Sequence, residues 1–371
     1  GSESTDVTIN EAGATPNRGS KRFNDSLPPA EWSFGTYVRP FKHGTNSWRQ
    51  SGDMDMVENI LWASIAGKDI TDGSLTSTSA SAVTVDSTDA DVSFERSEHH
   101  ELLKLSIFFA LENTTYRLNE AQVNQCEIDF SIDGIAQLTW SGNATTIDQV
   151  STAIEDPSKT LHAKPSGSDT SVTTATYVEG YNYADSTGPD DADYLRNKLS
   201  TLTLVAAAQG GGASAGGLDA RTYDINITGG SITIANNVTY VTPETLGIID
   251  KPIGSFTGSR QITGNLTCYL DTKSNGSNQL LTDLAGATDL VTNVFDMSLF
   301  MGGASSAVPV VEFDIPKAHM TVPTIETADL ISTSVEFAAH GTDLLTGDEM
   351  TVKYKGSTTH SDSQYATDYT V

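Results

Sequence analysis

The sequence predicts a mainly β fold, built from two tandem β-sandwich or barrel domains that each carry a short flanking helix. Three observations predict it. Short runs alternate apolar and polar residues with the period of two that is typical of strands. The composition is rich in Ser, Thr, Gly, Asn and Ala, and only 19% of residues are charged, which suits strands joined by turns. Several segments also recur in the same order in both halves of the chain, which indicates a duplication.

Five pairs of segments carry the predicted duplication. They pair residues 6–10 with 231–235, 34–41 with 263–270, 59–67 with 278–286, 105–109 with 297–301, and 123–142 with 322–341. The spacing between partners drifts along the chain, as insertions and deletions in loops produce. We therefore expect a first domain over 1–145, an acidic insertion over 146–193, a second domain over 194–357 with a Gly-rich loop or linker at 210–217, and a flexible tail over 358–371.

The strand predictions rest on alternation. Residues 262–270 separate an apolar face from a polar face, with Ile262, Leu266, Cys268 and Leu270 on one side and Thr263, Asn265, Thr267 and Tyr269 on the other. Residues 127–140 predict a hairpin in which Asp133-Gly134 forms the turn. The apolar positions that alternate along its two arms are Ile128, Phe130, Ile132, Leu138 and Trp140.

Each half also contains one predicted helix. The apolar face of the first consists of Val57, Ile60, Leu61, Ser64 and Ile65. We expect Asp53 to be its N-cap and Gly67 its C-cap. The second helix directs Leu280, Leu281 and Leu284 inward and ends at Gly286.

Charge and length exclude several classes of protein. The 371 residues suffice for two or three domains of roughly 100–200 residues, with a core that needs no metal or disulfide. The chain has 48 Asp and Glu against 21 Lys and Arg, a formal charge of -27 that repels phosphates and argues against a broad basic nucleic-acid face. No run of about 18 apolar residues predicts a membrane helix, and the first ten residues lack the features of a signal peptide.

No catalytic or metal-binding pattern is complete. The run from His99 to Lys104 begins like a zinc-binding helix, but Lys104 stands where the second histidine is needed. The segment 185–193 offers oxygen ligands without the spacing of a calcium loop, so a solvated acidic loop is favoured over a calcium site. Cys126 and Cys268 lie in strand-like runs and are expected to be buried free thiols. We expect no enzyme, no cofactor and no metal.

One segment departs from the acidic character of the chain. Residues 18–49 carry six cations against two acids, and these cations are Arg18, Lys21, Arg22, Arg39, Lys42 and Arg49. Three interpretations stay open: a nucleic-acid patch, a solvated face with local ion pairs, and a surface on which a second acidic copy docks. Subunit docking is preferred, because complementary patches fix the register between subunits.

Four stretches carry a resemblance to a known family. They are YLRNKLSTLTL at 194–204, the run from YDINITGG to LTCYL at 223–270, IDFSIDGIAQLTWSGNA at 128–144, and MTVPTIETADLISTSVEFAAHGT at 320–342. In these phrases the chain resembles tail tube proteins (major tail proteins) of long-tailed, siphovirus-type bacteriophages. The resemblance implies β-sandwich or barrel units with a flanking helix. In duplicated forms it implies three subunits in a pseudo-sixfold ring, and rings that stack into a tube through which genomic DNA leaves the capsid.

The same resemblance implies where the protein works and with what. It implies a place in the virion tail after synthesis in the host cytoplasm, with tail tip and terminator proteins as further partners. Viral DNA would pass through the lumen without specific binding. The alternatives are a surface adhesin or carbohydrate-binding β-module, and a protein that decorates a capsid; neither predicts a continuous central channel.

Overall fold

The computed structural model describes residues 3–8, 20–26, 28–43, 52–67, 83–94, 102–111, 114–150, 194–241, 252–288, 290, 293–322, 324–327, 331–343, 346–357 and 359–360. Within these ranges the protein is mainly β with two α-helices, which confirms the predicted fold class. No helix among the described residues is long and apolar enough to span a membrane.

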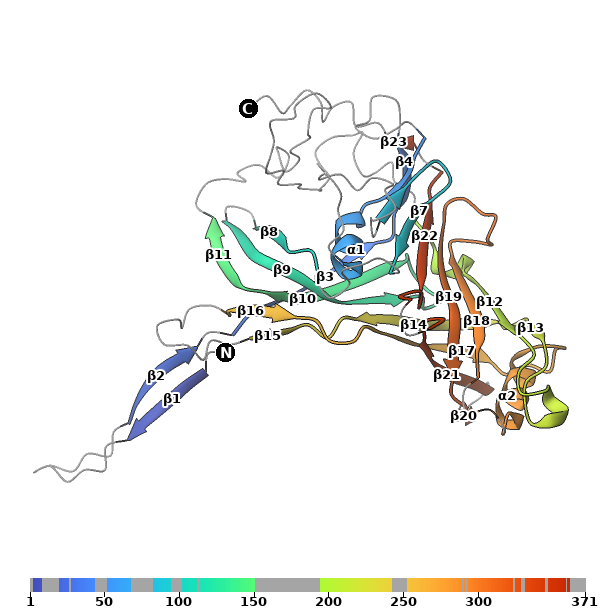
Figure 1. Ribbon diagram of the computed structural model, residues 1–371. Helices are drawn as coiled ribbons and strands as arrows, with labels where there is room; N and C mark the ends of the chain where they lie inside the picture. The colour runs from blue at the N-terminus through green and yellow to red at the C-terminus, as the bar shows by residue number, and fades with distance from the viewer. Residues whose placement is uncertain are drawn as a thin grey trace, which may run out of the picture.

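The first half contains eleven described strands and one helix. They are β1 (Glu3–Thr8), β2 (Ser20–Ser26), β3 (Ala30–Tyr37), β4 (Pro40–His43), β5 (Met54–Met56), α1 (Asn59–Ala66), β6 (Val83–Val85), β7 (Ala90–Ser93), β8 (Leu105–Leu111), β9 (Thr114–Asp129), β10 (Gln137–Ala144) and β11 (Thr146–Val150). The β1–β2 hairpin forms a separate sheet that projects from the body at the lower left of Figure 1.

The second half begins with the short 3-10 helix η3 (Asn197–Leu199). It continues with β12 (Thr201–Ala206), η4 (Ala213–Ala215), β13 (Arg221–Tyr223), β14 (Ile227–Ala235), β15 (Thr239–Val241), β16 (Gly254–Phe256), β17 (Gln261–Tyr269), α2 (Ser277–Gly286), β18 (Phe295–Met301), β19 (Val310–Met320), β20 (Thr324–Thr327), β21 (Ile331–Ala339), β22 (Thr351–Lys355) and β23 (Thr359–His360).

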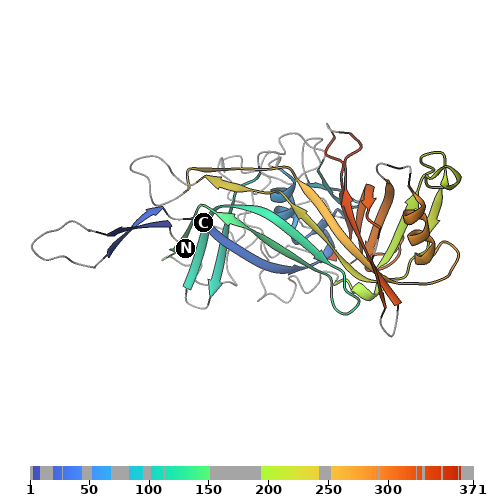
Figure 2. The same ribbon diagram turned by 90° about the horizontal axis from the view of Figure 1, so that it is seen from below.

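One large antiparallel sheet runs through both halves. Its main path is β13-β12-β18-β19-β21-β17-β14-β9-β10-β3. The halves join where β14 pairs with the end of β9, with Ser231 opposite Asp129 and Ala235 opposite Gln125. Seen from below in Figure 2, the strands from β3 to β21 lie side by side, and α1 lies behind them. The two halves therefore share one sheet.

The strand pairings of the two halves follow one pattern. In the first half β3 pairs with β10 and β8 pairs with β9; in the second β17 pairs with β21 and β18 pairs with β19. A helix follows β3 in the first half and β17 in the second. This pattern is compatible with the duplication and with the proposed domain boundaries, both of which stay predictions.

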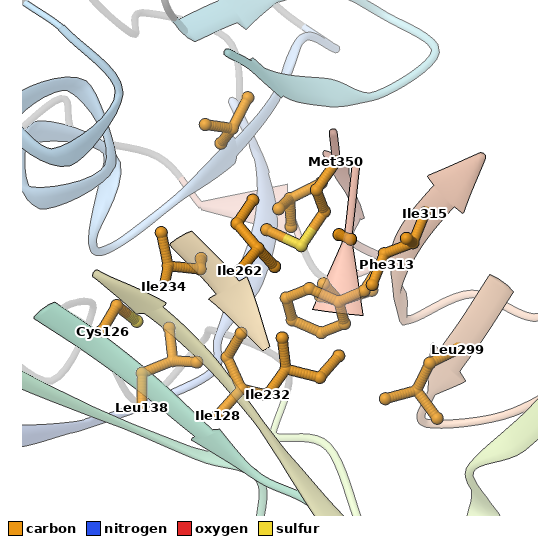
Figure 3. Close-up of a cluster of buried hydrophobic side chains, with 14 of the residues drawn as sticks. Cys126, Ile128, Leu138, Ile232, Ile234, Ile262, Leu299, Phe313, Ile315 and Met350 are labelled. Carbon is orange, nitrogen blue, oxygen red and sulfur yellow. The ribbon is translucent and has the colours of Figure 1, made fainter. Parts of the chain in front are cut away.

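Alternation along the strands places apolar side chains on one face of the sheet. Figure 3 shows side chains from β9, β10, β14 and β17 meeting those of β18 and β19 in one cluster. Ile262, Leu266 and Cys268 are buried as predicted, and so are Ile128, Phe130, Leu138 and Trp140. Both cysteines are buried free thiols, which confirms that prediction.

Two glycines on this inner face let neighbouring strands approach closely. A Cβ on Gly264 would lie 2.3 Å from the Ser231 carbonyl oxygen and 2.5 Å from the Phe337 ring. A Cβ on Gly230 would meet Phe130 in the same way, at 2.7 Å. In both places an aromatic ring from the adjacent strand occupies the volume that a side chain would need.

Side chains also tie the two halves together across the core. Arg260, just before β17, pairs with Glu349 of its own half at 2.5 Å and reaches the first half at Phe94, 4.6 Å from the centre of that ring. On the other side, the Trp62 indole of α1 donates a hydrogen bond of 2.9 Å to the Tyr354 hydroxyl of β22. The β6–β7 hairpin of the first half pairs with β22 as well.

Three local predictions are wrong or need refinement. Residue 58, not Asp53, is the N-cap of α1, because residues 54–56 are drawn into β5 by pairing with β4. Ile132 is 44% exposed, because β9 ends at Asp129 and the turn has already begun. The Gly-rich segment 210–217 is an ordered turn between β12 and β13, closed by backbone hydrogen bonds between Gln209 and Leu218. The helix ends at Gly67 and Gly286 are confirmed.

Candidate functional site

The candidate site is the face of the large sheet that points away from the core, over β3, β10, β9, β14, β17 and β21. We call it the polar face. Its side chains are Glu31, Ser33 and Tyr37; Gln137, Thr139, Ser141 and Asn143; Gln125, Glu127 and Asp129; Ser231, Thr233 and Ala235; Gln261, Thr263, Asn265, Thr267 and Tyr269; and Ser334, Glu336 and Ala338. All are exposed or half-buried.

Strand register arranges these side chains in rows across the sheet. One row runs from Tyr37 through Gln137, Asp129, Ser231 and Asn265 to Glu336. The next runs from Gly35 through Thr139, Glu127, Thr233 and Thr263 to Ala338. The rows cross the junction of the two halves without a break, so the polar face is one continuous surface.

The charge on this face has one sign. Its described side chains include four carboxylates and no Lys or Arg; the four are Glu31, Glu127, Asp129 and Glu336. The remainder are mostly hydroxyls and amides, such as Asn265, whose amide donates to the Ser231 hydroxyl at 3.1 Å. Such a surface holds a layer of water and repels anions, and it offers no cation to grip a phosphate.

The inner face of the same strands covers a buried polar cluster. Glu58 is 1% exposed at the start of α1, and burial raises the pKa of its carboxyl to about 8 although the charge of Arg39 opposes the shift. Burial also raises the pKa of the Cys126 thiol of β9 well above its usual range. The Tyr354 hydroxyl and backbone groups of residues 39 and 58 also lie close to the Glu58 carboxyl and oppose the rise of its pKa. This cluster is sealed from solvent, so it is part of the core rather than a site.

The structure does not bring the six predicted docking cations onto one described surface. Arg39 is 6% exposed and contacts the Tyr194 ring, with its guanidinium carbon 5.7 Å from the ring centre. Lys42 is half-buried in β4, whereas Lys21 and Arg22 lie on β2, at the opposite side of the molecule in Figure 1. Arg18 and Arg49 lie outside the described residues. The docking role of these residues stays a prediction.

Two other candidates fall largely outside the described residues. The acidic segment 185–193 lies there entirely, as does the histidine pair before Leu102. Lys104, at the end of that motif, is described and pairs with Glu120 at 3.6 Å on the surface. Within the described ranges no group of three or more His, Cys, Asp or Glu side chains is arranged to hold a metal ion.

Comparisons with known proteins give the same family twice. A family model described as phage tail tube protein matches residues 51–339. The tail tube protein pb6 of Escherichia phage T5 is 37% identical to the chain over 350 residues. That alignment covers 94% of this chain and 67% of pb6.

Proposed function

The chain belongs to the phage tail tube protein family and is a structural component of the virion tail, and on this premise we propose that its polar face lines the channel of the tube. The observation that carries the proposal is the continuous row structure of the polar face, which contains carboxylates and neutral polar groups but no described cation. A wall of this kind lets DNA pass without holding it. The role is structural, and we propose no catalytic activity.

We further propose that copies join side by side into a ring. Two open strand edges flank the polar face, because among the described strands β3 pairs only with β10 and β20 pairs only with β21. An open edge offers unpaired backbone groups to a neighbouring chain. The intrachain junction of β9 with β14 supplies a template for such a seam. A heterologous contact of this kind closes into a ring when its rotation allows.

A ring of three chains would give the wall a high negative charge. The whole ring would have a formal charge of three times -27, or -81, and three times four carboxylates, or twelve, would lie on the wall itself. Screening at physiological salt confines this repulsion to about 8 Å from the wall. The field would therefore keep phosphates from settling on the surface without slowing DNA at the centre of the channel. Tail tip and terminator proteins are the further partners that we propose.

Cysteine labelling of assembled tubes tests which face lines the channel. Both native cysteines are buried, so a cysteine in place of Thr139, in the middle of the polar face, reports on that face alone. A maleimide on a long polyethylene glycol chain should label the Thr139→Cys monomer and fail to label the same variant in tubes. Thr203→Cys, on an exposed position of β12 away from the polar face, is the matched control and should react in both states.

Two outcomes would contradict the proposal. Equal labelling of Thr139→Cys in monomers and in tubes would place the polar face on the outside. Negative-stain images that show only compact monomers at every concentration would remove the ring and the tube together.

A further inference from the structure

Large apolar side chains are exposed at two opposite ends of the sheet. Of the twelve large apolar side chains exposed among the described residues, seven fall into two groups. The hairpin patch consists of Tyr37, which is the last residue of β3 and lies at the rim of the polar face, together with Ile132, Ile135 and Tyr194, each of the four being 42–44% exposed. The arm patch consists of Val241, Ile253 and Phe256, which are 44%, 54% and 56% exposed. Exposed apolar groups gathered in this way mark interaction surfaces.

The hairpin patch is a fixed surface. The Tyr37 and Tyr194 rings meet edge to face, with centroids 5.8 Å apart. The turn between β9 and β10 is held against the segment at 194–197 by two backbone hydrogen bonds, which together make the bridge between Ile135 and Arg196: the Ala136 amide donates to the Leu195 carbonyl, and the Asn197 amide donates to the Gly134 carbonyl. A surface ordered before binding loses little conformational entropy when a partner covers it.

The arm patch is fixed in the same manner. The β15–β16 hairpin turns one face toward the body, where the Tyr240 hydroxyl donates to the Asn143 carbonyl at 2.9 Å and the Ser255 hydroxyl donates to Gln122. Because side chains alternate along a strand, Val241 and Phe256 point the opposite way, where no described residue covers them. The arm therefore presents Val241 and Phe256 outward from the end of the sheet, and the exposed Ile253, which precedes β16, donates its amide to the Val241 carbonyl beside them.

The two patches are joined by one strand. β14 starts beside the β9–β10 turn, where the Phe130 amide donates to the Gly230 carbonyl at 3.2 Å, and leads directly into β15. Nine residues of strand separate the patches by about 30 Å. In Figure 1, β15 and β16 lie at the left end of the sheet, while β9 ends at the right. A copy displaced along β14 by this length would bring its arm patch onto the hairpin patch of the first.

We propose that the arm patch of one copy docks on the hairpin patch of a copy in the adjacent ring, and that this contact stacks the rings. The inference rests on the proposed function, because it takes rings as given. A contact between opposite ends of identical chains is heterologous and does not close, so it generates a filament. It also fits the charge: chains of -27 repel one another, and burying apolar surface is an attraction that does not depend on opposite charges.

The salt dependence of tube assembly distinguishes this apolar contact from docking through basic residues. Added salt screens the repulsion between acidic rings and leaves apolar burial intact, so tube assembly should strengthen as NaCl is raised. Docking of the cations at 18–49 on an acidic neighbour would weaken under the same change. Assembly that weakens with salt would overturn the inference.

Substitutions in the two patches provide a second, independent test. Phe256→Asp and Ile135→Asp should each raise the concentration needed for tubes by at least about tenfold while rings still form. Ile147→Asp is the matched control, because Ile147 is 56% exposed on β11 outside both patches, and its variant should assemble like the native chain. Patch variants that assemble like the control would show that the stacking surface is elsewhere.

Crosslinking provides a positive result that does not depend on loss of assembly. Oxidised tubes of the Ile135→Cys, Phe256→Cys double variant should give a ladder of linked chains well beyond three, because every copy would be linked to one above and one below. A ladder that stops at the ring size, or no ladder in tubes seen by electron microscopy, would overturn the inference and leave the tube standing. Native chains that form no tubes at all would instead refute the proposed function.

Discussion

Replacing Glu58 by Gln should stabilise the protein at neutral pH, by an amount that grows with pH. The carboxyl has a pKa of about 8 in the folded chain against an ordinary value of 4.5, because burial disfavours its charged form. A carboxyl with a raised folded pKa contributes stability that is fully present below pH 4.5 and is lost as the pH rises through 8. At pH 7 the gap of 2.5 pH units above 4.5 corresponds to about 3.5 kcal/mol of unfolding free energy, at about 1.4 kcal/mol per unit.

The glutamine variant carries no such charge, so the difference between the two proteins is the quantity to measure. Urea denaturation, monitored by tryptophan fluorescence, should give nearly equal free energies of unfolding for the native protein and Glu58→Gln at pH 4.5. The advantage of Glu58→Gln should then rise by roughly 1.4 kcal/mol per pH unit and level off above pH 8. Glu127→Gln, at an exposed position on the polar face, is the control and should show no comparable rise. A difference for Glu58→Gln that is the same at pH 5 and pH 8 would show that burial does not raise the pKa of the Glu58 carboxyl.

Two further substitutions test a largely buried ion pair of the second half and the packing of the sheet. Arg260→Ala breaks the largely buried pair with Glu349 and should lower the free energy of unfolding by roughly 2–3 kcal/mol, whereas Arg117→Ala, in an exposed pair, should cost less than about 1 kcal/mol. Gly264→Ala forces a Cβ against a backbone carbonyl and an aromatic ring, so it should cost about 2–3 kcal/mol or prevent folding, whereas Gly254→Ala meets nothing within 4 Å and should be nearly neutral. Thermal and urea unfolding measure the free energy of unfolding of each variant and its control. If a variant and its control lose the same amount of stability, the contact assigned to that variant is contradicted.

Local sequence patterns predicted the faces of individual strands well. In β17 and β10 the alternation alone separates buried from exposed positions, because an amphipathic strand has only one way to bury its apolar side. The ends of both helices were predicted from the glycines at residues 67 and 286, because glycine is among the poorest helix formers. The start of α1 was predicted wrongly, because residues 54–56 pair with β4 and this pairing overrides the local capping signal at Asp53.

The sequence predicted the polar side of each strand but not the continuous face that these strands form together. Each strand shows its polar side, but the polar face exists because β14 of the second half pairs with β9 of the first, more than a hundred residues earlier. No local pattern encodes that pairing. The basic segment at 18–49 drew attention because its charge is contiguous in sequence, whereas the four carboxylates of the polar face come from three strands spread between residues 31 and 336. Their shared face becomes apparent only when the register is known.

A cryo-electron microscopy reconstruction of the assembled tube tests directly whether the polar face lines the channel. We expect β3, β10, β9, β14, β17 and β21 to form the innermost wall, with Glu127 and Asp129 pointing toward the tube axis and α1 lying outside the wall. A map in which these two carboxylates face the outer surface, or in which the channel is lined by a face that carries Lys or Arg, would contradict this expectation.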